Sequence, residues 1–197
     1  MEKRNWKHIV TLKQRMVLCL AAFFAAFALQ LALNGYQARA VQQVQDDQMG
    51  NFNAISRFQG GVESSISILE AYRWENGETE EMLEKLQAAC STSNAWLWRI
   101  RSNMDGLQNV SDEQWVLYGA VETTYGSYNT LLEELESYLS SGQEAKASQL
   151  YYNKVSVCGG YLSQYTMQLL KASILDAQTT YTEISELGER IALMQIV

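Results

Sequence analysis

Residues 16–33 read MVLCLAAFFAAFALQLAL, a run whose only clearly polar member is Gln30. No charged residue occurs between Arg15 and Arg39. At about 1.5 Å of rise per helical residue, residues 16–38 can cross a hydrocarbon core of roughly 30 Å. We therefore predict a transmembrane helix over residues 16–38, with the lipid bilayer as its partner.

The two sides of this run differ in charge. Residues 1–15 contain five basic side chains and one acidic one, which leaves 10 of the chain's 15 basic and 21 of its 22 acidic groups for the remainder. The positive-inside rule makes residues 1–15 a cytoplasmic basic tail. It places residues 39–190 on the outer side of the cell membrane, which in a bacterium with two membranes is the inner (cytoplasmic) membrane. An acidic outer domain argues against nucleic acid as a partner.

A cleaved signal peptide is the alternative to an uncleaved anchor. Ala38-Arg39-Ala40 fits the small-x-small pattern of a cleavage site, and Asn34-Gly35 before it disturbs a helix. The apolar cores of signal peptides usually run about 7–15 residues, and this one is longer. The length favours an anchor, whereas cleavage at Ala40 would release a secreted helical protein.

The rest of the chain carries helix signals. It contains no proline, and the alternating β-branched runs typical of strands are missing. Breaks at residues 76–77, 105–106 and 140–142 separate four helices. We predict an all-α chain in which the transmembrane helix continues into an antiparallel up-down-up-down four-helix bundle with long outer helices over residues 39–190.

Each predicted helix has an apolar stripe at spacings of three and four residues. The stripes are Phe52, Ile55, Gln59, Val62, Ile66 and Leu69; Met82, Leu86, Ala89, Ser93, Leu97, Ile100 and Met104; Tyr118, Val121, Tyr125, Tyr128, Leu132, Leu135 and Leu139; and Leu162, Tyr165, Leu169 and Ala172. The third stripe alternates as heptad a and d positions do. The fourth then shifts to Leu170, Ile174, Ala177, Tyr181, Ile184 and Ile191. Such a shift indicates a change in supercoil or a different face becoming buried.

Capping residues mark the start of two helices. Thr79 is a good N-cap for the second helix. Ser111 fits the N-cap of the third, with Gln114 three positions later completing a capping box.

The cysteines do not form a disulfide framework. Cys19 lies in the apolar run, which leaves Cys90 and Cys158 outside, where one bridge is chemically allowed. Counted down from the helix turns, the two differ in level by about 7–8 Å, which favours free thiols.

Residues 191–197, IALMQIV, are apolar enough to begin a second membrane segment. Seven residues are far too few to span, so we expect the start of a truncated second transmembrane helix. A frayed helix end is the alternative.

Residues 128–147 read YNTLLEELESYLSSGQEAKA, where a Tyr/Leu heptad meets a glycine and an alanine-rich helix. Together with the basic tail, the apolar run and the four helices, this stretch resembles the sensory input region of bacterial transmembrane receptors. These are sensor histidine kinases and methyl-accepting chemotaxis proteins. The residues that would decide between them, such as a phosphoacceptor-histidine helix, ATP-binding glycine motifs or methylation helices, do not occur in this sequence.

The resemblance implies an extracytoplasmic sensor domain of a two-component histidine kinase. Such a domain would form a homodimer through its bundle helices and pass a helix shift or rotation through the membrane. A chemoreceptor input domain is one alternative. Another is a membrane-anchored adaptor that docks a partner protein without signalling.

The residues present do not predict an enzyme. The only histidine, His8, lies in the basic tail, so Ser-His and Cys-His catalysis and His-ligated metal sites are excluded outside the membrane. Carboxylate clusters such as residues 133–136 are typical of solvated helix faces. We expect no catalytic residues, no cofactor and no metal.

One layer of the predicted bundle is unusual in composition. About 17–20 residues below the membrane-distal turns it gathers Arg57, Trp98, Arg99, Tyr125 and Tyr161 with Gly60-Gly61 and Gly159-Gly160. Glycine inside a helix costs up to about 1 kcal/mol relative to alanine. The glycines either make room for Trp96 or Trp98, or belong to an aromatic-walled pocket. In such a pocket, Arg57 or Arg99 would point inward and bind a small anionic ligand.

Overall fold

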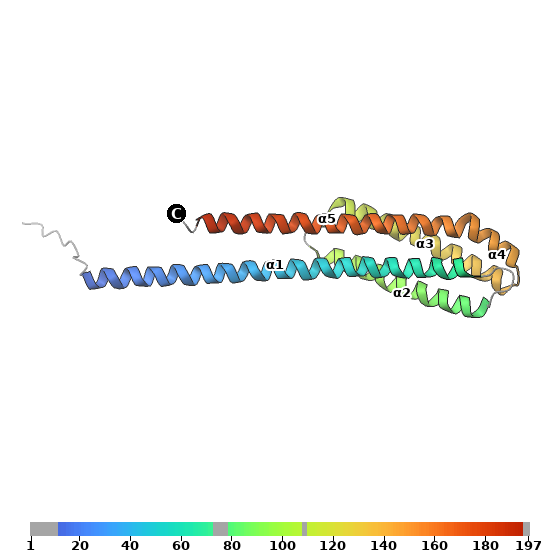
Figure 1. The fold of residues 1–197 in the computed structure, drawn as a ribbon, viewed down its shortest axis with the longest axis horizontal. Coiled ribbons are helices and arrows are strands. Elements are labelled where there is room, and N and C mark those ends of the chain that lie inside the picture. Colours follow the sequence, from blue (N-terminus) through green and yellow to red (C-terminus); the bar gives the residue numbers. More distant parts are fainter. Residues whose placement is uncertain (1–11, 73–78, 108–109, 195–197) are drawn as a thin grey trace, which may run out of the picture. The chain divides into compact units, whose positions relative to one another are not determined.

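The structure is a computed structural model that describes residues 12–72, 79–107 and 110–194. Within these ranges it is almost entirely helical and contains no strand, so the predicted all-α class is confirmed. The elements are α1 (Leu12–Ala71), α2 (Thr79–Gly106), α3 (Asp112–Ser140), α4 (Glu144–Leu150), the π-helical turn η1 (Tyr151–Val155) and α5 (Ser156–Met194) (Figure 1). The basic tail before Leu12 and residues 195–197 lie outside the described residues.

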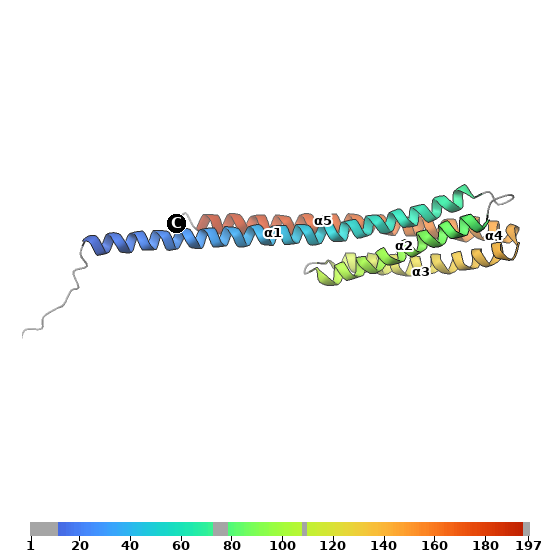
Figure 2. The ribbon, with the colours of Figure 1, turned by 90° about the horizontal axis from the view of Figure 1, so that it is seen from below.

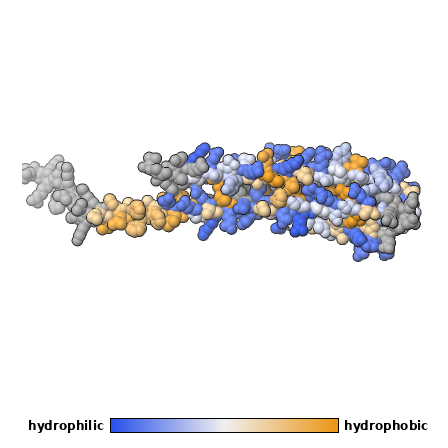
Figure 3. All heavy atoms as spheres, viewed as in Figure 1, coloured by the Kyte–Doolittle hydropathy of each residue, from blue (hydrophilic) through white to orange (hydrophobic). Residues whose placement is uncertain are grey.

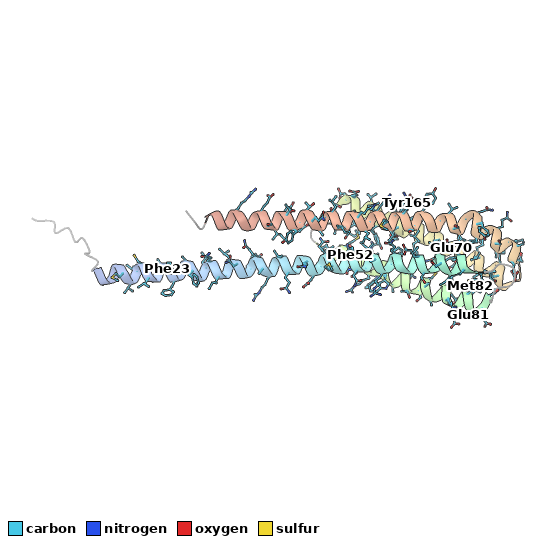
Figure 4. All side chains as sticks on the ribbon, in the orientation of Figure 1. Phe23, Phe52, Glu70, Glu81, Met82 and Tyr165 are labelled. Atoms are coloured by element: carbon cyan, nitrogen blue, oxygen red, sulfur yellow. The ribbon has the colours of Figure 1, made fainter. Side chains whose placement is uncertain are left out.

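The chain divides into two compact units, Met1–Gln43 and Val44–Val197. The described part of the first unit, residues 12–43, contains the apolar portion of α1, which is coloured orange in Figure 3. Its large side chains are exposed along the helix, as Phe23 in Figure 4 illustrates with 69% of its surface exposed. Among the described residues one helix, α1, is long and apolar enough to cross a membrane, judged by length and composition.

Helix α1 passes through Asn34 and Gly35 without a break. The predicted disturbance at this dipeptide is therefore wrong. A helical glycine costs only up to about 1 kcal/mol, and no proline is present to remove a backbone hydrogen bond.

The second unit has one apolar core to which α1, α2, α3 and the continuous segment α4–η1–α5 all contribute. Figures 1 and 2 show α3 and α5 running side by side, and both α2 and α4 also pack on α3. Phe58 of α1 packs edge-on against Tyr125 of α3, with ring centroids 5.3 Å apart. The largest fully buried side chains include Tyr128, Phe58, Ile55, Leu69, Ile100, Met104 and Leu135.

The predicted apolar stripes of α2 and α3 are confirmed. All seven predicted residues of α3 are buried. On α2, six of the seven are buried, and Ala89 is half-buried. Two adjacent residues of α2 are labelled in Figure 4: Met82 is buried, whereas Glu81 is exposed. The apolar residues of α3, spaced strictly by three and four positions, therefore predicted its core face correctly.

The core face of α1 includes Ile55, Val62 and Leu69 as predicted, but it differs from the predicted stripe at other positions. Asn51, Phe58 and Ser65 are buried, whereas Phe52 is 37% exposed and Gln59 is half-buried. Two polar residues reach the core because they find partners there. Asn51 Nδ2 donates to Ser173 Oγ of α5 at 3.3 Å, and the Ser65 and Tyr128 hydroxyls lie 3.0 Å apart. A prediction that selects only apolar residues for the buried stripe could not include Asn51 and Ser65.

The start of α3 confirms one half of the predicted capping box. Ser111 Oγ accepts a hydrogen bond from Gln114 N at 3.3 Å. The other half is wrong, because Ser111 N–H donates to Asp176 Oδ2 of α5 at 3.1 Å and Gln114 is buried. Thr79 is already inside α2, and its hydroxyl pairs with that of Tyr72 at 2.7 Å.

The predicted fourth helix contains a wider turn near its start. The buried positions Ala147, Tyr151, Val155 and Gly159 are separated by three steps of four residues. Each such step overshoots an α-helical turn by about 0.4 residue. The π-helical turn, in which Ser156 N–H bonds Tyr151 O, takes up this drift and keeps the stripe on the core.

The predicted second face of this helix is buried only in part. Leu170 packs against the core and Ala177 and Ile184 are half-buried, whereas Ile174 is 40% and Tyr181 is 64% exposed. The side chain of Ile191 lies outside the described residues. The core of α5 instead continues through Ser173 and Thr180, two small polar residues that pattern reading passed over.

One glycine of each pair permits a close helix approach. A Cβ at Gly61 would lie 2.3 Å from Ser93 Oγ, and one at Gly159 would lie 3.1 Å from Ile66 Cδ1. Gly60 and Gly160 have no such neighbour within 4 Å. Close packing therefore explains Gly61 and Gly159, but against Ser93 and Ile66 rather than against a tryptophan.

Alanine at Gly60 and at Gly61 should have opposite effects on stability. Gly60→Ala should raise the free energy of unfolding by up to about 1 kcal/mol through helix propensity. Gly61→Ala should lower it by about 1–3 kcal/mol, because Ser93 Oγ must move and the site is overpacked. Chemical denaturation of the full chain in detergent measures both. Adding Ser93→Ala should restore much of the loss in Gly61→Ala, and equal effects of the two single variants would contradict this packing.

Candidate functional site

The five residues of the predicted ligand layer do not meet in one cavity. Tyr125 is 3% exposed and belongs to the core, but Trp98 is 68% and Tyr161 is 55% exposed. Arg57 and Arg99 are exposed as well. The expected arginine directed into a polar cavity is therefore not what the structure shows, and binding of an anion by these residues stays a prediction.

The direction of each side chain explains the difference. The levels agree in part, since Phe58 contacts Tyr125 as expected but Gly61 approaches Ser93, three residues before Trp96 on α2. On α2, however, the buried stripe passes through Leu97 and Ile100. At about 100° per residue, Trp98 and Arg99 point about 130° away from the centre of that stripe, one on each side.

A groove of about 280 Å³ opens instead between α2 and α3. Its apolar lining comes from Leu83, Leu86, Tyr125 and Leu132. The remaining lining residues are polar or carry a thiol: Gln87, Cys90, Ser91, Asn94, Asn129, Glu133 and Glu136. Of the five predicted site residues, Tyr125 lines this groove.

One end of the groove is organised around Tyr125. Its hydroxyl donates to the backbone oxygen of Cys90 at 2.8 Å and so links α3 to α2. Asn129, one helical turn further along α3, has a buried Oδ1 without a hydrogen-bond partner among the described residues. A buried unpaired acceptor costs about 1–3 kcal/mol, and a ligand would recover that cost only if the Asn129 amide turned to expose Oδ1 to the groove.

The other end of the groove is acidic. Glu136 Oε1 accepts from Gln87 Nε2 at 2.8 Å across the two helices, and Glu133 lies one turn away on α3. Burial, and secondly the charge of Glu136, raise the pKa of the Cys90 thiol to about 11. Burial also raises the pKa of Tyr125 to about 12, although hydrogen bonding to Asn129 opposes the shift. Both groups are therefore neutral near pH 7.

The groove presents a neutral thiol and a neutral phenol beside two carboxylates. Neither neutral group is an activated nucleophile. Within the described ranges, no group of three or more His, Cys, Asp or Glu could hold a metal ion. The groove is slightly smaller than most ligand pockets, which measure about 300–1,000 Å³. Its acceptors and carboxylates fit a small molecule with an apolar body and a donor or amine, and they oppose an anion.

The sequence carried a weak signal for this groove that its apolar pattern hid. Asn94 and Asn129 stand beside the core stripes of α2 and α3, at positions where a polar side chain borders the seam between the helices. Only the packing of α2 on α3 shows that these positions face each other across a hollow.

Comparisons with protein-family models, with curated proteins and with solved structures found no match. The function is therefore argued from the residues of the chain and their geometry.

The Cys90 thiol should react slowly with alkylating reagents until strongly alkaline pH. In a chain with Cys19→Ser and Cys158→Ser, the iodoacetamide rate should rise to a midpoint near pH 11, since the thiolate is the reactive form. Glu136→Gln should lower this midpoint only in part, because burial is the larger cause. Glu134→Gln is the matched control and should leave it unchanged.

The same shift has a consequence for stability. The folded-state pKa of Cys90 lies above the ordinary value of 9.0, so its contribution to stability is complete below pH 9 and is lost between pH 9 and about 11. A midpoint near 9 in the alkylation experiment would show that the thiol is not buried as described.

Proposed function

We propose that this chain is the extracytoplasmic input region of a bacterial membrane receptor, specifically of a two-component sensor histidine kinase. The observation that carries the proposal is the composition of α1. One helix contains both an apolar stretch whose large side chains from Met16 to Leu31 are exposed and, after Val44, residues that are fully buried in the core of the second unit. A long exposed apolar surface is unfavourable in water, whereas the hydrocarbon core of a lipid bilayer would cover it.

The topology follows from the same helix. Residues 16–38 would span the inner membrane with residues 1–15 in the cytoplasm, as the charge difference requires. The second unit would then be an antiparallel up-down-up-down four-helix bundle outside, formed by α1, α2, α3 and α4–η1–α5. Two features support this bundle: the shared core and the short connection between α3 and α4, where Gly142 adopts a positive φ of 69°.

The candidate groove is placed to influence α1. Tyr125 lines the groove and also packs edge-on against Phe58 of α1. A ligand that moves Tyr125 or separates α2 from α3 would therefore press directly on the helix that leads to the membrane. Small helix shifts of this kind are a common form of signal transmission. A chemoreceptor would use the same input geometry, so the proposal concerns the input role first.

Thiol labelling in intact cells tests the topology. In a chain whose three native cysteines are replaced by serine, a membrane-impermeant maleimide should label Ser64→Cys, an exposed position on α1. It should label Glu2→Cys only after the cells are lysed. The reverse pattern would refute the proposed orientation, and loss of Glu2→Cys from the mature protein would indicate signal-peptide cleavage.

Small amines and small carboxylates distinguish the two candidate ligand sites. If the groove binds the stimulus, amines with an apolar body should raise the melting temperature of the full chain in detergent. Glu133→Gln combined with Glu136→Gln should abolish this effect by removing the carboxylates. Arg57→Gln with Arg99→Gln is the control. A stabilising carboxylate that needs these arginines would instead favour the layer predicted from sequence.

A further inference from the structure

A second pocket, which shares no residue with the groove between α2 and α3, lies along α5. Its volume is about 190 Å³, and Asp176, Thr179, Thr180 and Glu183 line it. These residues are three, four and seven positions apart, so they share one face of the helix. Each of the four side chains carries oxygen, in two carboxylates and two hydroxyl groups. We call these four residues the α5 pocket.

The hydroxyl group of Thr180 is buried in this pocket without a partner. Thr180 is 8% exposed, and its hydroxyl has no hydrogen-bond partner among the described residues. Thr166, Thr179 and Thr182 of the same helix instead donate to the backbone oxygen four residues before each of them. Because a buried polar group without a partner is costly, a bound group that pairs with Thr180 would be favoured.

The carboxylate of Asp176 is held in place but keeps one oxygen for a ligand. Its Oδ2 accepts a hydrogen bond from Ser111 N–H at 3.1 Å, which ties the pocket to the start of α3. Figures 1 and 2 show α5 continuing past this level. Asp176 and Glu183 form no ion pair within the part of the chain that the structure describes. Both therefore remain available to a cation.

The surroundings of the α5 pocket are negatively charged. Asp112 and Glu113 directly follow Ser111 and are exposed in the first turn of α3. No lysine, arginine or histidine occurs in residues 172–189 or in residues 102–145. A surface lined by one sign of charge raises the local concentration of ions of the opposite sign. The pocket therefore attracts cations and repels anions.

The spacing of the two carboxylates favours a cation that keeps its water shell. Asp176 and Glu183 are seven residues apart, which is about 10 Å along the helix axis. A bare ion, whose ligand oxygens lie at about 2.0–2.6 Å, bridges such a span poorly. A hydrated ion can reach carboxylates up to about 9 Å apart through its bound waters. At about 30 Å³ per water, the pocket also has room for about six waters.

We propose that the α5 pocket binds a hydrated Mg²⁺ ion. Asp176 and Glu183 would accept hydrogen bonds from its waters, and the Thr180 hydroxyl would accept another. Mg²⁺ dehydrates reluctantly and is often bound through one or two carboxylates with several waters retained. We expected no metal from the sequence because histidine is missing outside the basic tail, but Mg²⁺ prefers oxygen ligands.

A bound ion would act on the contact between α3 and α5. It would reduce the repulsion between the carboxylates of the pocket and those of Asp112 and Glu113, next to the hydrogen bond from Ser111 to Asp176. Mg²⁺ should therefore stabilise the folded chain. This proposal needs neither a ligand in the groove nor the proposed topology, so each can fail without the others.

Thermal unfolding of the full chain in non-ionic detergent, at constant ionic strength, tests the site. Mg²⁺ should raise the melting temperature, with half of the effect at about 0.1–1 mM. Asp176→Asn with Glu183→Gln should raise this concentration at least tenfold, and the asparagine can still accept from Ser111. Glu80→Gln with Glu84→Gln, on an exposed face of α2, is the matched control. An unchanged response in the Asp176 and Glu183 variant, or equal stabilisation by NaCl, would overturn the proposal.

Competition shows whether the ion keeps its waters. Hexaamminecobalt(III), an inert complex similar in size to hydrated Mg²⁺, should displace Mg²⁺ from the pocket. Thr180→Val should weaken binding of Mg²⁺ and of the complex at least threefold. Thr182→Val is the control, because its hydroxyl is exposed and bonds Gln178 O. Displacement by Ca²⁺ but not by the complex would indicate direct coordination and overturn the hydrated site.

Mn²⁺ locates the ion, since it prefers the same oxygen ligands and broadens nearby NMR signals. In the labelled full chain, backbone amide signals of residues 111–113 and 176–183 should broaden first. Those of residues 80–84 should not, although they include several carboxylates. Equal broadening at all acidic segments would show nonspecific attraction and overturn the site.

Discussion

Helix α1 has to satisfy two different surroundings with one continuous ladder of backbone hydrogen bonds. In the first unit residues 16–31 are apolar apart from Gln30, and their large side chains are exposed along the helix. In the second unit it must present a narrow stripe that includes Ile55, Phe58 and Leu69 to three other helical segments. In the proposed receptor, the continuous helix would carry a displacement of the stripe to the apolar stretch.

The contacts of α1 with its neighbours depend on small residues and on one aromatic pair. Gly61 lets Ser93 approach, and Gly159 makes room for Ile66. Phe58 lies edge-on to Tyr125, whose hydroxyl holds the backbone of α2. Tyr125 thus touches α1, α2 and the groove at once, which makes it the residue through which an occupant of the groove would act.

The sequence predicts α2 and α3 well because each faces one core with an uninterrupted alternation of threes and fours. It fails where polar residues complete a stripe. Asn51, Ser65 and Ser173 read as surface residues, yet each is buried with a partner on another helix or on the preceding turn. The candidate site failed for a related reason. The height of a residue along the bundle can be counted from the sequence. The direction in which Trp98 and Arg99 point follows from the buried stripe of α2, and a groove between two helices depends on the distance between them.

The polar character of the α1–α5 contact bears on how a signal could pass. Asn51 and Ser173 meet at 3.3 Å, and Asn51 Oδ1 is buried without a partner among the described residues. Interlocked leucines would resist sliding, since packed cores are not continuously deformable. Small hydroxyl and amide groups can exchange hydrogen-bond partners over a short shift at little cost. An unpaired acceptor gains if a shift supplies a donor. The proposed receptor would therefore have its tightest packing on α3, and its most adjustable contact between the two helices that lead to the membrane.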